Sequence, residues 1–142
     1  MSEDNKRTER ELQQIEARLK LAQHIAGLGF FETEFATNQD YWSDEVYEIY
    51  GIGKEGFIPN KETAIAMTVP EDRELHHSTV RAAIDTGAVY ELRHRILRTN
   101  GELRYLHVRG EVLRDSEGRP QKLFGTIMDI TEQELQAQAI TR

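Results

Sequence analysis

The chain has 142 residues, 38% hydrophobic and 30% charged, a balance typical of one soluble globular domain with polar extensions. Its formal net charge of -7 argues against nucleic acid or an anionic membrane as a direct partner. The absence of cysteine excludes disulfides, thiolate metal sites and any cysteine nucleophile or photo-adduct. No apolar run reaches the roughly 20 residues of a membrane span, and nothing resembles a signal peptide, so we expect a cytoplasmic location.

Residues 1–27 are expected to form an amphipathic N-terminal helix or linker. Leu12, Ile15 and Leu19 have the spacing of a coiled-coil seam. Only about two heptads are present, so the helix is not expected to form a stable coil alone. Two interpretations are open: the helix lies on its own domain, or it dimerises with a second copy.

Residues 28–130 are expected to form the main domain, which begins with short elements. Ser43 has the position of an N-cap and Gly51 that of a C-terminal stop for the first helix. Thr68 and Glu71 have the spacing of a capping box for the longest helix. In order, the sequence predicts strands at 30–35 and 41–42 and helices at 44–50, 61–68 and 70–86.

Three longer strands are predicted in the second half of the chain. Asn100-Gly101 and the turn at 115–118 separate them, and residues 131–142 are expected to start a C-terminal helix. Strands segregated from helices in this way predict an α+β fold, an antiparallel sheet with helices across one face. The three strands are predicted at 89–97, 103–114 and 121–130.

Alternation along the strand at 103–114 separates two faces. Its inner face carries Leu106, Val108, Gly110 and Val112, and Gly110 together with Gly125 leaves room for close helix packing or a small cavity. The outer face carries more apolar surface than a solvated face needs, so the N-terminal helix, a second copy of the sheet, or both are expected to cover it. The predicted dimer interface consists of Leu12, Ile15, Leu19, Leu103 and Tyr105.

Several segments resemble the PAS family, in the same order along the chain. The resemblance covers roughly residues 25–134. It implies a PAS-like five-stranded antiparallel sheet with helices on one face, flanked by N- and C-terminal helices. One departure is Val69, which stands before the proline where this subgroup often has histidine. The matching segments are 41–51 (YWSDEVYEIYG), 69–73 (VPEDR), 100–105 (NGELRY), 115–120 (DSEGRP), Gly125 and 129–132 (DITE).

The resemblance implies a non-catalytic sensory and dimerisation module that relays a signal to a downstream output domain in cis, of histidine kinase or diguanylate cyclase type. Asp129, Ile130 and Thr131 would transmit the signal into the exit helix. The residues themselves predict that Thr131 caps this helix with Glu134, and that Asp129 bonds nearby backbone or pairs with an arginine. The sequence contains no phosphate loop, HExxH motif or nucleophile elbow, so we expect neither catalysis nor a metal site.

The alternative function is a sensor that binds haem or a small metabolite. His76 lies ~35° from the apolar centre of its helix, and the resemblance makes it the candidate axial ligand for haem. An unidentified small molecule is the stronger candidate, because a histidine near a helix N-terminus is more often hydrogen-bonded or half-exposed than a ligand. Besides His76, the predicted pocket residues, which would also form the core of an empty domain, are Phe31, Tyr47, Ile84, Leu106, Val108 and Ile127.

Overall fold

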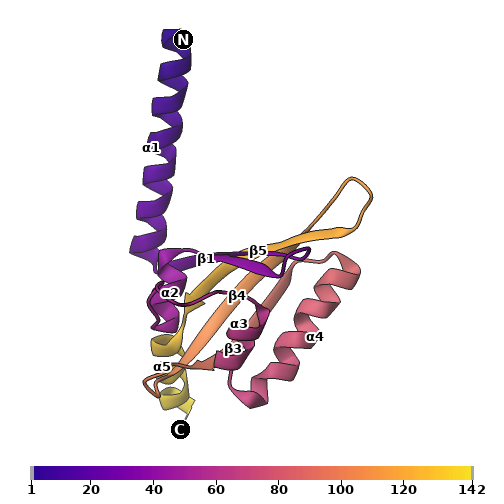
Figure 1. Cartoon of the computed structure of the whole chain (residues 1–142). Helices are drawn as coiled ribbons and strands as arrows, with labels where there is room; N and C mark the ends of the chain where they lie inside the picture. The colour runs from indigo at the N-terminus through magenta and orange to yellow at the C-terminus, as the bar shows by residue number, and fades with distance from the viewer. Residues whose placement is uncertain (1, 142) are drawn as a thin grey trace.

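The computed structural model describes residues 2–141, which form an α+β domain between two terminal helices, as predicted (Figure 1). No helix within these residues has the length and apolarity needed to cross a bilayer. The elements in chain order are α1 (Glu3–Ala26), β1 (Leu28–Glu34), β2 (Gln39–Trp42), α2 (Asp44–Tyr50), α3 (Lys61–Met67), α4 (Pro70–Thr86), β3 (Tyr90–Leu97), β4 (Leu103–Arg114), β5 (Pro120–Asp129) and α5 (Thr131–Thr141).

The five strands form one antiparallel sheet in the order β2-β1-β5-β4-β3. Helices α2, α3 and α4 come between the two edge strands in the sequence, and they pack on one face of the sheet (Figure 1). Because β1 pairs with β5, Leu28 lies opposite Met128. The chain therefore enters and leaves the domain at the same end of the sheet, on two adjacent interior strands.

Helix α1 projects away from the sheet (Figure 1). Within its range none of the side chains is buried, and Leu12, Ile15 and Leu19 are each more than half exposed. The interpretation that this helix lies on its own domain is therefore wrong, and α1 leaves the outer sheet face uncovered. Contact with the domain is confined to the helix end, where Gly27 adopts a left-handed conformation with φ 65° and leads into β1.

The core lies between the inner sheet face and the helices. Val46, Ile96 and Leu106 are its largest fully buried side chains. Each such side chain contributes about 1.5–3 kcal/mol relative to an exposed one. Trp42 joins β2 to the helical layer, because its ring lies 4.6 Å from that of Tyr50, measured between centroids.

Both inner-face glycines permit close contacts within the sheet. A Cβ atom on Gly110 would lie 2.4 Å from the ring of Tyr90, which occupies that space from the neighbouring strand. A Cβ atom on Gly125 would lie 2.1 Å from the carbonyl oxygen of Arg109. Neither helix packing nor an empty cavity, the two explanations predicted from the sequence, accounts for these glycines.

Ser43 is the N-cap residue of α2 as predicted, but it makes no side-chain cap, and the predicted capping box of α4 is wrong. Ser43 precedes α2, but its hydroxyl accepts the N–H of Phe30 at 2.9 Å and so ties β1 to the start of the helix. The N-cap of α4 is Val69, whose side chain cannot cap, while the Thr68 hydroxyl donates to the carbonyl of Ala64 at 3.1 Å. In both cases the hydroxyl bonds a backbone group outside the helix that it precedes.

The start of α4 is held by a carboxylate instead. Asp72 accepts the backbone N–H of Arg95 at 2.8 Å and its guanidinium at 2.8 and 2.9 Å. The hydrogen bond from the Arg95 side chain holds the pKa of Asp72 below its ordinary value, although burial opposes this shift. Bidentate contacts of this kind are strong and directional. They fix the first turn of α4 against β3.

Candidate functional site

A cavity of about 420 Å³ lies between the inner sheet face and the helices. This volume is in the range of small-molecule sites. Two predicted pocket residues lie outside its lining: Tyr47 packs edge-on against Trp42 at 5.4 Å, and Leu106 is fully buried in the core. The predicted residues that do line the cavity are Phe31, His76, Ile84, Val108 and Ile127.

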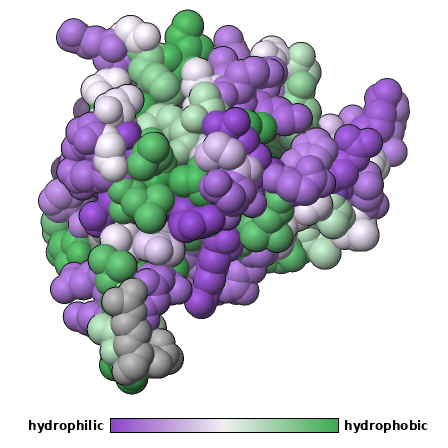
Figure 2. Space-filling model, turned by 90° about the horizontal axis from the view of Figure 1, so that it is seen from below, coloured by the Kyte–Doolittle hydropathy of each residue, from purple (hydrophilic) through white to green (hydrophobic). Residues whose placement is uncertain are grey.

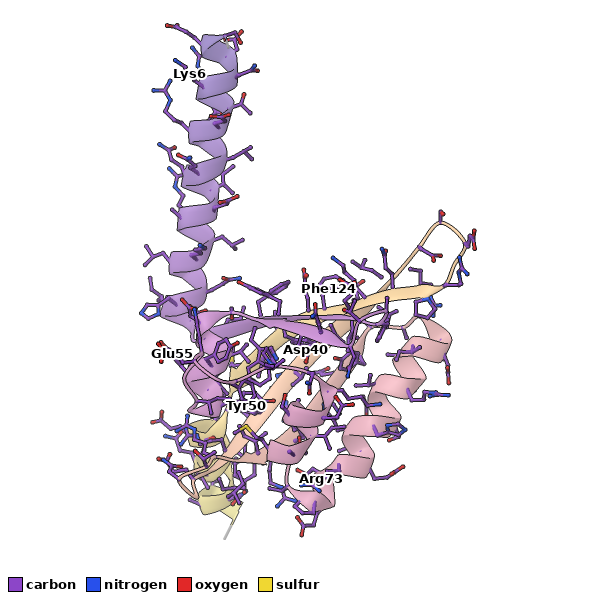
Figure 3. The ribbon with its side chains drawn as sticks, in the orientation of Figure 1. Lys6, Asp40, Tyr50, Glu55, Arg73 and Phe124 are labelled. Atoms are coloured by element: carbon purple, nitrogen blue, oxygen red, sulfur yellow. The ribbon has the colours of Figure 1, made fainter. Side chains whose placement is uncertain are left out.

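Asp40 is a cavity residue that the sequence interpretation missed. It lies on β2 with its side chain toward the helices (Figure 3), and Trp42, two residues later, also lines the cavity. Its Oδ1 atom is buried and has no hydrogen-bond partner in the described part of the chain. Burial raises the pKa of Asp40, a hydrogen bond with Thr33 lowers it, and the charge of Glu62 raises it further.

His94 on β3 is the second missed residue, and it is only 4% exposed. Neither of its ring nitrogens has a hydrogen-bond partner among residues 2–141. Burial lowers the pKa of His94 to about 4, with a contribution from His76, so the ring is neutral near pH 7. The two imidazoles meet edge to face, with centroids 5.3 Å apart. His76 thus points toward the cavity as predicted, and burial lowers its pKa as well.

Two tyrosines complete the polar lining. Tyr50 from α2 and Tyr90 from β3 are both buried, and burial raises the pKa of each hydroxyl. The negative charge of Asp40 adds to both shifts, which indicates that the two hydroxyls and the carboxylate share one region of the cavity. Both tyrosines remain protonated near pH 7 and can donate hydrogen bonds.

A haem fits this lining poorly. The buried carboxylate of Asp40 and the two unpartnered nitrogens of His94 need hydrogen-bonding or charged partners. The apolar face of a porphyrin would leave the Asp40 carboxylate unpaired, and iron would take only one nitrogen of a histidine. As a separate observation, residues 2–141 contain no group of three or more His, Asp or Glu side chains that could hold a metal ion. The lining is suited instead to a small molecule with polar groups of its own.

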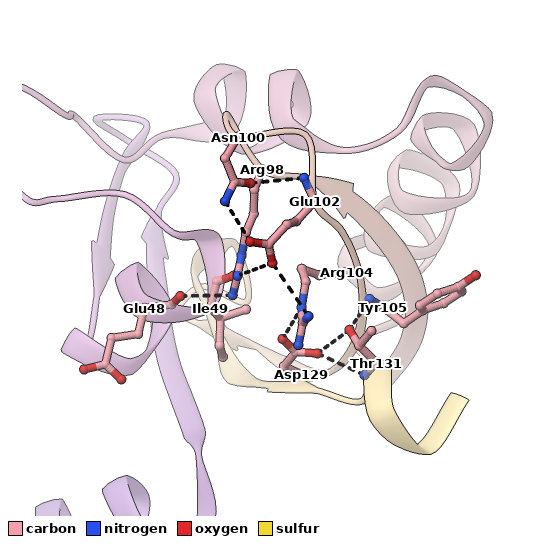
Figure 4. A network of polar contacts seen from close by, with 9 residues as sticks. All are labelled: Glu48, Ile49, Arg98, Asn100, Glu102, Arg104, Tyr105, Asp129 and Thr131. Carbon is pink, nitrogen blue, oxygen red and sulfur yellow. Dashed lines mark hydrogen bonds and ion pairs between the residues drawn. The ribbon is translucent and has the colours of Figure 1, made fainter. Parts of the chain in front are cut away.

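The predicted transmission residues form a compact joint at the end of β5 (Figure 4). Asp129 accepts Arg104 Nε at 2.9 Å through one oxygen, and through the other it accepts the N–H and the hydroxyl of Thr131 at 2.9 and 2.5 Å. Thr131 Oγ1 in turn accepts the N–H of Tyr105 at 2.9 Å. Burial acts to raise the pKa of Asp129, but the hydrogen bonds from Thr131 and Arg104 outweigh it and the pKa is lowered.

Thr131 does not form the predicted capping box with Glu134. The N–H of Glu134 donates to the carbonyl of Ile130 at 2.9 Å, and the carboxylate of Asp129 takes the first free N–H of α5. The N–H of Ile130 donates to the carbonyl of Tyr105 at 2.8 Å. The other prediction, that Asp129 bonds nearby backbone or pairs with an arginine, is confirmed in both forms.

A second polar chain connects this joint to α2 (Figure 4). Arg98 donates to the carbonyls of Ile49 and Glu48 at 3.0 and 3.3 Å, at the C-terminal end of α2. It also donates to Glu102 at 3.0 Å, and the same Glu102 oxygen lies 3.9 Å from Arg104 Nη1. The network therefore runs without a break from α2 through the β3–β4 hairpin to the start of α5. The sequence interpretation missed Arg98, whose partners on α2 are distant in the chain, and Glu102, which links Arg98 to Arg104.

The predicted dimer residues occupy two separate surfaces of one chain. Leu12, Ile15 and Leu19 lie on the projecting helix α1, whereas Leu103 is exposed and Tyr105 half-buried at the start of β4. Tyr105 also meets α5, because Gln138 Nε2 lies 3.4 Å from its hydroxyl. Seen from the end where the C-terminus lies, the surface carries patches of hydrophobic residues between hydrophilic ones (Figure 2).

The chain is similar to segments of larger signalling proteins. It is 30% identical over 127 residues to the probable diguanylate cyclase DgcE of Escherichia coli K12, a match that covers 89% of this chain and 11% of the relative. It is 24% identical over 107 residues to the sensor protein FixL of Bradyrhizobium diazoefficiens, covering 75% of this chain and 21% of the relative. The chain thus spans about a tenth to a fifth of the length of these relatives.

Solved structures share the fold. A sensory box histidine kinase/response regulator from Burkholderia thailandensis superposes with a TM-score of 0.75 at 24% identity, over 87% of this chain and 92% of that one. The N-terminal domain of a diguanylate cyclase with PAS/PAC sensor from Marinobacter aquaeolei gives 0.69 at 19% identity, over 75% and 98%. In the sequence, residues 39–127 match the profile of the family described as the PAS fold. The chain therefore belongs to the PAS family.

Proposed function

We propose that this chain is a non-catalytic sensory and dimerisation module that relays a signal to an output domain on the same polypeptide. Relatives named as a diguanylate cyclase and as a blue-light-activated histidine kinase support an output domain of one of these two types. The observation that carries the proposal is the hydrogen-bonded joint centred on Asp129. We further propose that the module works in the cytoplasm.

The joint suits a relay because one carboxylate bonds three elements at once. Asp129 belongs to β5, Arg104 to β4 and Thr131 to α5. Each of these hydrogen bonds is directional and partly shielded from water. A displacement of either strand therefore changes the orientation of the first turn of α5, which leads out of the domain.

The network of polar contacts that begins at α2 supplies the input side of the relay. Tyr50 lines the cavity and ends α2, and Arg98 binds the carbonyls of the two residues just before it. A ligand that moves Tyr50 would move the acceptors of Arg98. Glu102 and Arg104 would carry this movement to Asp129, because coupling travels through contiguous contacts of this kind.

Dimerisation is proposed through α1 and the outer face of the sheet. Helix α1 has 24 residues and presents Leu12, Ile15 and Leu19 to solvent along one seam. An apolar seam at heptad spacing is buried when two such helices pair. Leu103 and Tyr105 on β4 would extend the interface onto the sheet.

The decisive test is Asp129→Ala in the intact protein with its output domain. We expect output activity that no longer responds to the signal, while the domain remains folded by circular dichroism. Glu132→Ala is the matched control, because this exposed residue of the first turn of α5 has no contact with the network. Normal signal-dependent activity of Asp129→Ala would contradict the proposal. If the alanine variant does not fold, Asp129→Asn keeps an acceptor for Thr131 and removes only the charge.

Ligand sensing in the cavity is the second candidate, favoured by the unpartnered atoms of Asp40 and His94. Leaving buried polar atoms unpaired costs about 1–3 kcal/mol each. A ligand that satisfies them recovers this free energy. Native mass spectrometry of the purified chain, followed by denaturation to release the bound compound, tests whether the cavity is occupied. A mass equal to that of the chain alone, in every preparation, would count against this candidate.

A further inference from the structure

We infer that the cavity binds a small organic cation, a primary amine with an aromatic body, whose charge is held by the carboxylate of Asp40. This inference rests on the proposed ligand-sensing function and names the ligand class for it. It is carried by three features of the lining: an uncompensated carboxylate, aromatic walls beside it, and neutral hydrogen-bonding groups from the opposite edge strand.

The carboxylate of Asp40 lacks a cationic partner. Its Oδ1 atom is buried without a hydrogen bond in the described structure, and its backbone N–H is already used by the carbonyl of Pro59 at 3.2 Å. A buried carboxylate is stable only when it is paired or protonated. Burial is the main cause that raises the pKa of Asp40, as expected for a carboxyl group in need of a partner.

The charged groups at the mouth of the cavity do not compensate Asp40. The one charged side chain that contributes to its pKa shift is Glu62, which is itself acidic and raises the pKa. Arg81 lies 3.8 Å from Asp85 on the exposed side of α4, and Lys61 is exposed at the start of α3. A cationic ligand would supply the missing charge, and the net charge of -7 favours its approach.

The walls beside Asp40 are aromatic. Trp42, Tyr50 and Tyr90 line the same cavity. An aromatic ring attracts a cation that lies over its face within about 6 Å, and the attraction grows when water is excluded. A carboxylate among aromatic side chains therefore favours an ammonium group, whereas it would repel a carboxylate ligand. The aromatic rings also suit an apolar ligand body.

The polar groups at the opposite side of the cavity favour a ligand with a polar group at its far end. Asp40 and His94 lie on the two opposite edge strands, β2 and β3. A neutral imidazole offers one donor and one acceptor, and both nitrogens of His94 are unpaired. A hydroxyl group on the ligand would satisfy either nitrogen. Tyramine, which carries an ammonium group, a phenyl body and a hydroxyl, has all three features.

The test is calorimetric titration of the full chain at pH 7.5 with four probes of similar shape. Tyramine has every feature, phenethylamine lacks the hydroxyl, 4-ethylphenol lacks the amine, and 4-hydroxyphenylacetate reverses the charge. We expect tyramine to bind most tightly, phenethylamine next, and 4-ethylphenol at least about ten-fold more weakly than tyramine, since one lost charge-assisted contact corresponds to a factor of ten or more. The acid should not bind detectably.

Two variants separate local recognition from the general field of the protein. Asp40→Asn keeps the shape of the side chain and should lower tyramine affinity at least about ten-fold while leaving 4-ethylphenol unchanged. Glu111→Gln removes the same charge from the exposed outer face and should leave all affinities within about two-fold. If Asp40→Asn does not fold, the comparison of tyramine with 4-ethylphenol on the wild-type chain still decides.

Three outcomes would overturn the inference: equal binding of tyramine and 4-ethylphenol, an unchanged tyramine affinity in Asp40→Asn, or no binding by either amine. The inference and the proposed function can be contradicted independently of each other. A non-basic compound released from the purified chain would mean that the cavity senses a ligand of another class, so the inference fails while ligand sensing stands. The response of Asp129→Ala tests the relay without reference to any ligand.

Discussion

The buried imidazole of His94 predicts a specific loss of stability in mild acid. Its pKa is about 4 in the folded chain against an ordinary value of 6.5, because burial disfavours the charged ring. The unfolded chain therefore takes up the proton first as the pH falls. The contribution to stability is complete above pH 6.5, is lost progressively between pH 6.5 and about 4, and changes no further below that. Between pH 7 and pH 4.5 this loss amounts to about 2 kcal/mol.

Replacement of His94 by leucine removes this titration and keeps an apolar side chain of similar volume in the core. Urea unfolding of both proteins, followed by circular dichroism at pH 7 and pH 4.5, gives two free energies of unfolding for each. We expect the wild type to lose about 2 kcal/mol more than His94→Leu between these pH values. Comparing the two proteins cancels the carboxylate titrations to which His94 does not contribute, including those of Asp40 and Asp129.

The control is His77→Gln, which removes an exposed histidine from the adjoining helix and should follow the wild-type pH dependence. The reasoning is refuted if His94→Leu loses as much stability as the wild type over this range. That result would mean that His94 binds its proton equally well in both states, for example because water reaches the ring. An equal change in the free energy of unfolding at both pH values would report packing alone.

Three further predictions concern stability and assembly. Gly110→Ala should destabilise the fold by about 1–3 kcal/mol in urea unfolding, because its Cβ would overlap the ring of Tyr90, and the second change Tyr90→Leu should recover part of the loss. The double variant Ile15→Asp, Leu19→Asp should elute as a monomer in size-exclusion chromatography with light scattering, and a wild-type chain that is monomeric at high concentration would remove α1 from its proposed role. Asn60→Ala should cost about 1 kcal/mol, because the Asn60 side chain accepts the N–H of Thr63 at 2.9 Å in a capping box, and an unchanged unfolding midpoint would argue against that cap.

The second half of the fold was the most predictable from sequence, because its signals are local. The alternation of residues 103–114 gives β4 its observed bounds, and Asn100-Gly101 forms the turn before it. Helix α4 likewise begins at Pro70 and ends at Thr86, before a glycine with positive φ. In these segments a few neighbouring residues determine the backbone conformation.

The missed features depend on partners from distant parts of the chain. Ser43 is the N-cap residue of α2, but its hydroxyl accepts the N–H of Phe30, thirteen residues earlier on β1. Asp40 follows a polar stretch of sequence, although its period-two relation to Trp42 places both on one face of β2. Likewise the alternation of Tyr90 and His94 along β3 assigns both to the inner face. The unpaired state of Asp40 Oδ1 and of the His94 nitrogens depends on the surrounding helices, which no local pattern describes.

The pairing of β1 with β5 has a consequence for how such a domain can be built into other proteins. Since Leu28 lies opposite Met128, about a hundred residues begin and end at neighbouring points on adjacent strands, at one end of the sheet. Deleting or inserting the whole unit would change the distance between the flanking segments by little more than one strand spacing. A chain that carries residues 28–130 twice in tandem should therefore tolerate the duplication. Each added copy would mainly rotate the helix that follows it.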